Sequence, residues 1–386
     1  MSISAAIANA VSGLTAASRG TEIVSTNIAN SQTEGYARRE LELSSRLYER
    51  GGGVVINGID RIVNAGLLAD SRLSQAQLGA SDTIAQFHRA MENVVGTATD
   101  ASSLGGSLTA FNAALTNAAA RPDSDVRLSA VVDTATALAN KINKIAERTI
   151  ANDVSRLNSA LERVASLNKQ IAALSAQGKD ASSQMDARQA AIDSISEIVP
   201  LKQVPRDNGQ VALFTTGGGI LLDGTKPASI EFTPAGPISP GMSLAAGTLS
   251  NLRFNGKELT VSQQATMFAK GTISASFAVR DEIAPAYQTQ IDALARDLYD
   301  RISDPALDTT LPTGGPGLFT DDQNAFLNAN EAGFANRISV NSSVDPASGG
   351  ELWRIRAGIN TATPGDTGES RLLNNLSSAL CAVRAP

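Results

Sequence analysis

Residues 1–30 read MSISAAIANAVSGLTAASRGTEIVSTNIAN, and this opening stretch decides how the rest of the chain is interpreted. Apolar or small side chains recur along it at alternating steps of four and three: Ile3, Ile7, Ala10, Leu14, Ala17, Thr21, Val24 and Ile28. The spacing predicts a helix of about eight turns with one narrow seam along one side. Because a seam this narrow gains little on an isolated helix, we interpret these eight residues as an assembly seam that needs a partner helix. An ordinary amphipathic helix on a globular core is the alternative.

The residues after this helix predict a helix end, a turn and then an extended segment. Asn30 is expected to cap the helix by adopting the left-handed region, and Gly35 is expected to permit a turn. Residues 37–43 alternate as a strand does. The candidate functional residues of this signature turn are Asn27, Asn30, Thr33, Gly35 and Tyr36.

Residues 27–39 resemble the N-terminal signature of bacterial flagellar axial proteins, which share a heptad helix, an Asn-Ile-Ala-Asn segment and a Thr-x-Gly-aromatic turn. The version here is most similar to the hook-associated members at the hook–filament junction. Three later segments also resemble that group: 51–60, 185–193 and 279–292. Members of the family normally finish with a long heptad helix that pairs with the first one. The residues after Ser370 show no second seam, so that C-terminal helix is expected to be missing here.

The resemblance implies a structural subunit of the flagellum that joins hook to filament, located outside the cell. It implies copies of the chain itself, the hook protein, the next hook-associated protein and an export chaperone as partners. It also implies export through the flagellar type III apparatus, without a cleaved signal peptide. Another axial protein (hook protein, flagellin or another hook-associated protein) is the first alternative. A secreted enzyme on an elongated scaffold is the second.

Composition agrees with a structural rather than a catalytic chain. Aromatic residues make up 4% of the 386 residues and the net charge is −6, so an aromatic-lined pocket and a nucleic-acid partner are both disfavoured. The first 30 residues lack the charged start and continuous apolar core of a signal peptide, and no run is long enough to span a membrane. Cys381 is the single cysteine, which excludes an internal disulfide.

The pattern along the chain predicts a mainly α fold: an elongated helical-bundle rod domain with an inserted small all-β domain and an N-terminal heptad helix. Residues 124–176 are predicted as one long helix. The domain boundaries are expected as follows: 1–36, heptad helix and signature turn; 37–66, extended linker with short strands; 67–200, first part of the rod; 201–265, β domain; 266–386, second part of the rod, with a loop-rich tract at 304–370.

We identify no catalytic residue, cofactor site or metal site. His88 is the only histidine and is interpreted as a surface or packed residue, and Asp321, Asp322 and Asn324 lack EF-hand spacing. Asp186 and Arg188 are expected on a solvated helix face. Asn168 interrupts an apolar stripe between Ile150 and Ile171, where it either fixes the register of helix packing or is partly solvated.

Overall fold

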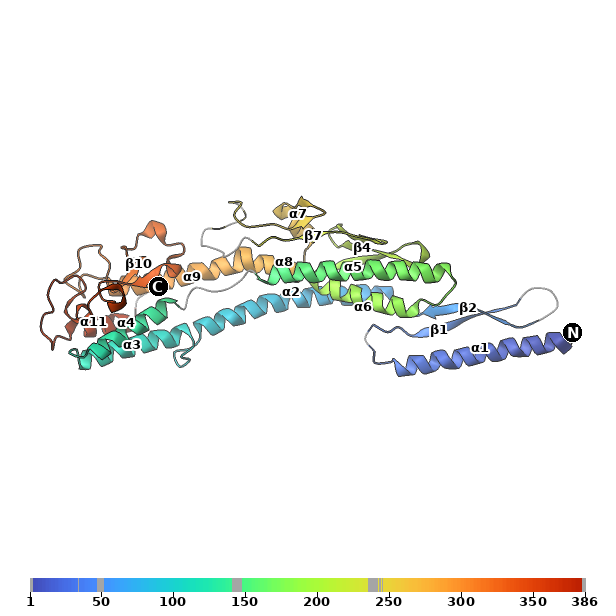
Figure 1. The fold of residues 1–386 in the computed structure, drawn as a ribbon, viewed down its shortest axis with the longest axis horizontal. Coiled ribbons are helices and arrows are strands. Elements are labelled where there is room, and N and C mark those ends of the chain that lie inside the picture. The colour runs from blue at the N-terminus through green and yellow to red at the C-terminus, as the bar shows by residue number, and fades with distance from the viewer. Residues whose placement is uncertain are drawn as a thin grey trace. The chain divides into compact units, whose positions relative to one another are not determined.

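The computed structural model describes residues 3–33, 35–46, 52–140, 148–234, 242, 244 and 246–383. Its fold is mainly α (Figure 1), which confirms the predicted fold class. The helices are α1 (Ile3–Ala29), α2 (Ala65–Val95), α3 (Leu104–Ala120), α4 (Asp125–Asn140), α5 (Arg148–Ala176), α6 (Ser182–Ile198), α7 (Val261–Met267), α8 (Thr272–Ala278), α9 (Ala284–Ile302), α10 (Arg354–Ala357) and α11 (Arg371–Cys381). The strands are β1 (Arg39–Ser45), β2 (Val54–Arg61), β3 (Leu201–Pro205), β4 (Val211–Thr215), β5 (Ile220–Asp223), β6 (Lys226–Pro227), β7 (Ile230–Glu231), β8 (Arg253–Phe254), β9 (Lys257–Glu258), β10 (Phe319–Asp321) and β11 (Ile338–Val340).

The chain divides into two compact units, each assembled from separate stretches of sequence. Unit 1 consists of Met1–Thr83, Arg148–Pro234 and Ser250–Ser276. Unit 2 consists of Ile84–Glu147, Ala235–Leu249 and Phe277–Pro386. The domain boundaries predicted from the sequence stay predictions.

In unit 1, strands β1 and β2 form an antiparallel hairpin that lies along α1 (Figure 1). The register pairs Arg39 with Arg61 at one end and Ser45 with Val54 at the other, with a bulge after Glu42. Leu41 and Ile59 are opposite each other, half-buried, on the face that alternates with the exposed Glu40 and Asp60. The hairpin therefore has one sheltered face and one polar face, as expected of a two-stranded ribbon against a helix.

The core of unit 1 is built on α5. Its apolar stripe is buried along the whole helix, and full burial of each such side chain stabilises the fold by about 1.5–3 kcal/mol. The buried members are Ile150, Val154, Leu157, Leu161, Val164 and Ile171. Helix α6 packs along α5, and the sheets of order β3-β4-β5-β6 and β7-β8-β9 contact α5 as well. Residues 201–265, predicted as an inserted β domain, thus contribute their sheets to the unit that contains α5.

Unit 2 has its own core, formed by α3, α4, α9, α11 and the short β10–β11 pair. Phe111, Phe319 and Phe334 are fully buried there. A single π-helical segment, Val279–Ile283, precedes α9, and Pro285 occupies the first turn of that helix. The residues before it, Ile283 and Ala284, are helical as well, so the π-helical segment lets the helix continue past a proline that has no N–H to donate.

The stretch predicted as one helix, 124–176, is described as α4 and α5, which belong to different units. The residues between them, 141–147, lie outside the described ranges. No described helix is both long enough and apolar enough to cross a membrane.

Candidate assembly site

The predicted seam of α1 faces solvent. All eight seam residues are exposed, and the large ones strongly so: Ile3 is 81%, Leu14 72% and Ile28 71% accessible. The side of α1 that packs is a different one, where Ala16 and Ile23 are buried. A continuous apolar stripe left in solvent beside an already packed face is the signature of an interaction surface.

Small residues let the hairpin approach the packed side of α1 closely. The Val54 amide donates to Ser12 Oγ at 3.1 Å where β2 begins. Gly53 has a φ of +142°, and a Cβ built there would lie 3.0 Å from Ser12 Oγ and 3.2 Å from Asn9 Oδ1. Gly52 and Gly53 form a loop that leads into β2 at Val54, while Gly51 lies outside the described ranges.

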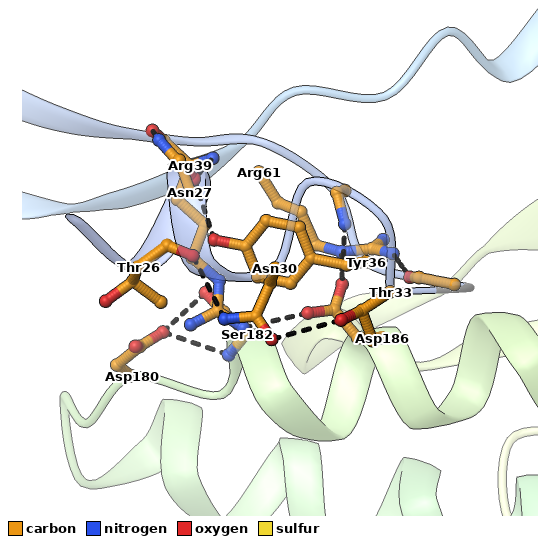
Figure 2. A network of polar contacts seen from close by, with 12 residues as sticks. Thr26, Asn27, Asn30, Thr33, Tyr36, Arg39, Arg61, Asp180, Ser182 and Asp186 are labelled. Atoms are coloured by element: carbon orange, nitrogen blue, oxygen red, sulfur yellow. Dashed lines mark hydrogen bonds and ion pairs between the residues drawn. The ribbon is translucent and has the colours of Figure 1, made fainter. Parts of the chain in front are cut away.

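Asn27 connects the end of α1 to the first strand (Figure 2). Its side-chain amide donates to the Arg39 carbonyl at 2.9 Å, and its Oδ1 accepts from the Arg39 N–H at 2.9 Å. The Tyr36 hydroxyl donates to the same Oδ1 at 2.7 Å, and the Arg39 guanidinium lies 5.0 Å from the centre of the Tyr36 ring. One amide side chain therefore satisfies three polar groups and sets where the strand begins.

Asn30 closes the helix by a mechanism other than the predicted one. It is not among the described residues with positive φ, so the prediction of a left-handed Asn30 is wrong. Its side-chain amide and its backbone N–H instead both donate to the Thr26 carbonyl, each at 3.0 Å. Thr33 Oγ1 donates to Asn30 Oδ1 at 3.3 Å. Gly35 does adopt positive φ, +78°, as predicted for the turn.

A single carboxylate holds the signature turn and the base of the hairpin on α6. Arg39 and Arg61 are directly opposite in the hairpin, an arrangement of like charges that is destabilising by itself. Asp186 accepts from Arg39 at 2.8 Å and from Arg61 Nε at 2.6 Å, and the Ala37 amide donates to it at 3.2 Å. The three charged side chains are 12–15% exposed, so these pairs are poorly screened by solvent.

Gly35 brings the signature turn into close contact with α6. A Cβ at Gly35 would lie 3.3 Å from the Ala190 Cβ and 3.5 Å from the Asp186 carbonyl. The Asp180 carboxylate accepts from the Ser182 amide at 2.9 Å and so satisfies an open amide at the start of α6 (Figure 2).

Sequence reasoning missed Asp186 as the anchor. The available signal was the pair of arginines, Arg39 and Arg61, within the predicted linker strands of residues 37–66, because two like charges brought together need a carboxylate from elsewhere.

The prediction that Asp186 and Arg188 lie on a solvated helix face is wrong, because α6 is covered by the turn on one side and by α5 on the other. Arg188 is 7% exposed and donates to Asn168 Oδ1 at 2.8 Å and to the Gly209 carbonyl at 2.6 Å. Burial, and secondarily the charge of Arg61, lowers the pKa of Arg188 to about 10. Arg188 therefore remains charged at neutral pH.

Asn168 has no accessible surface, which rules out the solvated alternative. Its amide donates to the Val211 carbonyl at 2.8 Å and to the Gly224 carbonyl at 2.6 Å. It holds the strands β4 to β6 on α5, and because its Oδ1 accepts from Arg188 it also joins α5 to α6.

The residues considered for catalysis or metal binding have structural partners. His88 Nδ1 lies 2.9 Å from the Tyr287 hydroxyl, inside an aromatic cluster with Phe87. Asp321 binds Arg337 at 2.7 Å. Within the described ranges, no group of three His, Cys, Asp or Glu side chains is placed to hold a metal ion.

Residues 88–305, more than half of the chain, match the family model described as "Flagellar hook-associated protein FlgK helical domain". The chain belongs to the FlgK family of flagellar hook-associated proteins. A second model, "Flagella basal body rod protein", matches residues 7–36, which cover most of α1 and the signature turn.

Relatives of this FlgK-family chain include proteins named "Flagellar hook-associated protein 1". The one from Salmonella typhimurium is 26% identical over 251 residues, covering 60% of this chain and 45% of the relative. The one from Escherichia coli is 24% identical over 277 residues (67% and 50%), and the one from Bacillus subtilis 28% over 221 residues (51% and 43%). The chain spans about half the length of the curated relatives it matches. The solved structure of the flagellar hook junction protein FlgK from Burkholderia pseudomallei is 20% identical, with a TM-score of 0.45 over 66% of this chain and 46% of that one.

Proposed function

We propose that this chain is a structural, non-catalytic subunit of the bacterial flagellum at the hook–filament junction. Membership of the FlgK family and relatives named hook-associated protein 1 support this role. The observation that carries it is the exposure of the whole α1 seam beside a packed face that already holds the hairpin. A helix with an unpartnered apolar stripe is stabilised by a further helix along that stripe.

In this role the α1 seam makes the lateral and axial contacts that build a tube. Copies of the chain, the hook protein and the next hook-associated protein are the proposed partners, and an export chaperone is proposed for the chain before assembly. Identical subunits joined by unlike surfaces produce rings or open helices, the geometry that an axial structure requires. The Asp186 anchor fixes how the turn and hairpin enter unit 1, so that the seam is presented in a defined direction.

A chromosomal deletion tests the role directly. Cells without the gene should carry bare hooks and release filament protein into the medium, and the intact gene should restore attached filaments. Normal filaments on the deletion strain would contradict the proposal.

Variants of the α1 seam test whether its exposed side chains are needed for assembly. Leu14→Asp and Ile28→Asp should leave the isolated chain folded, because both side chains are already exposed, yet abolish filament attachment. Ser18→Asp is the matched control, since it places the same charge on an exposed, non-seam position of α1. Full motility of the Leu14→Asp, Ile28→Asp double variant would exclude the seam from assembly.

A further inference from the structure

A groove of about 600 Å³ runs along unit 1 between α5 and α6. Its floor is built from alanine and serine side chains, which leave space because they are small, and from Ile198. The charged residues in its lining are two arginines, and none of its described lining residues comes from the hairpin of the same chain. The lining consists of Ser155, Arg156, Ser159, Ala160, Arg163, Ala187, Ala190, Ala191, Ser194 and Ile198.

The two arginines stand on one side of α5. They are seven residues apart, which places them about 10 Å apart along the helix and nearly in line. Arg156 is 55% exposed and pairs with Asp153 at 3.6 Å and with Glu197 at 3.3 Å. Arg163 is exposed and forms no ion pair with any described residue. The groove therefore offers a positive side to whatever lies in it.

One face of the hairpin of the same chain gathers acidic side chains. Glu40 is directly opposite Asp60 and Glu42 is opposite Gly58, so the three carboxylates share one face of the ribbon, and all three are exposed. Arg38 pairs with Glu40 at 2.7 Å. Glu42 and Asp60 form no ion pair with a described residue, although like charges on facing strands repel each other. An external cation would relieve that repulsion.

An exposed apolar pair follows these carboxylates in the sequence but lies on the other face of the ribbon, because neighbouring strand residues point to opposite faces. Beyond the bulge, Leu43 is opposite Ile56, and they are 49% and 38% exposed. The hairpin thus carries two unpaired acids on one face and an apolar pair on the other. The groove combines an apolar floor with an arginine that has no described ion-pair partner. Complementary charges on two surfaces steer their association and fix its register.

We propose that the α5–α6 groove of one copy receives the acidic face of the β1–β2 hairpin of a second copy, with Glu42 beside Arg163. Because the two surfaces lie on different parts of the same chain, the contact is heterologous and repeats from copy to copy. It rests on the proposed structural role and names one of the contacts that role requires, in addition to the α1 seam.

Disulfide trapping tests the contact with the full chain. In a Cys381→Ser background, one population carries Glu42→Cys and the other Arg163→Cys. When they are mixed under mild oxidation, a crosslinked dimer should form, and neither population alone should reach a comparable yield. Glu258→Cys replaces Glu42→Cys in the control mixture, because Glu258 is an exposed acid on β9, away from the hairpin. A Glu42–Arg163 yield no higher than this control would overturn the proposal.

Charge exchange supplies the second measurement. Glu42→Arg or Arg163→Glu alone should weaken self-association at least about tenfold, and the two in one chain should restore it, because the attractive pair is re-formed with its signs reversed. Circular dichroism confirms folding of each variant, and self-association is read by sedimentation velocity. Unchanged association of both single variants, or no recovery in the double variant, contradicts the inference.

Filament attachment in cells separates this inference from the proposed function. Should the intact chain restore filaments to the deletion strain while the Glu42–Arg163 crosslink is absent from isolated flagella, the hairpin contact is wrong and the junction role stands. Should the intact chain fail to restore filaments, the junction role fails whatever the crosslinking result.

Discussion

Asn27 at the end of α1 pairs with the backbone of Arg39 as a neighbouring strand residue would. Its amide donates to the Arg39 carbonyl and accepts from the Arg39 N–H, both at 2.9 Å. The Asn27 side chain thereby makes the pair of hydrogen bonds that a neighbouring strand would make with the backbone at the start of β1. This explains in physical terms why an asparagine stands here: its side chain combines one acceptor and one donor on the same planar amide.

Asn27→Ala should detach the start of β1 from α1. The substitution removes two hydrogen bonds to Arg39 and one from Tyr36, and each partly buried group left unpaired costs about 1–3 kcal/mol. We expect faster hydrogen exchange at residues 23–39 and earlier proteolysis in the turn. Ser18→Ala on the exposed side of α1 is the control and should leave exchange unchanged. Equal protection in Asn27→Ala and wild type would show that the network is dispensable.

Asp186→Ala should destabilise unit 1 by about 3 kcal/mol, because Arg39 and Arg61 would face each other without a counter-charge in a poorly solvated site. The unfolding midpoint in urea is the measurement. Glu40→Gln, which breaks the exposed Arg38–Glu40 pair, is the matched control and should change stability by less than about 1 kcal/mol. A midpoint for Asp186→Ala that equals the control would contradict the anchoring role.

Asn168→Leu should be strongly destabilising although it makes the α5 stripe continuously apolar. It leaves the Val211 and Gly224 carbonyls and the Arg188 guanidinium without their partner, at about 1–3 kcal/mol for each buried group. Gln170→Leu, on the exposed side of the same helix, should be close to neutral. The measurement is the thermal unfolding of both variants. A gain in stability from Asn168→Leu would show that the hydrogen bonds of Asn168 do not stabilise unit 1.

Asp153 should make unit 1 less stable as pH rises. Burial raises its pKa above the ordinary value of 3.8, and the hydrogen bond from Thr272 and the charge of Arg156 offset only part of that shift. A carboxyl group whose pKa is raised by folding contributes its stability below pH 3.8 and loses it as the pH passes through the raised value. Asp153→Asn, which keeps an acceptor for Thr272, should therefore be at least as stable as wild type at neutral pH.

The measurement for Asp153 is the difference in Tm between wild type and Asp153→Asn across the acid range. It should grow in favour of the variant as pH rises and then level off. Asp207→Asn, at an exposed turn position, serves as the control. A difference that shrinks with rising pH would mean that the carboxylate is stabilised by its surroundings.

Local patterns could be interpreted correctly from the chain alone. The seam of α1 and the apolar stripe of α5 both follow from spacing, because period and side-chain type act within a few residues. The wrong prediction for Asp186 and Arg188 and the alternative left open at Asn168 share one cause: each residue is interpreted from the surface of its own helix. Their partners are 20 to 149 residues away along the chain, and no local pattern contains that information.

The sequence by itself determined that α1 has an apolar seam and that the signature turn follows it, since both depend on helix geometry and on backbone preferences of single residues. The tertiary structure decided which side of α1 is covered and which is left for a partner. It also decided that one carboxylate neutralises two opposed arginines. Those outcomes depend on where the hairpin and α6 pack, and packing is settled by the free energy of the whole unit rather than by any one segment.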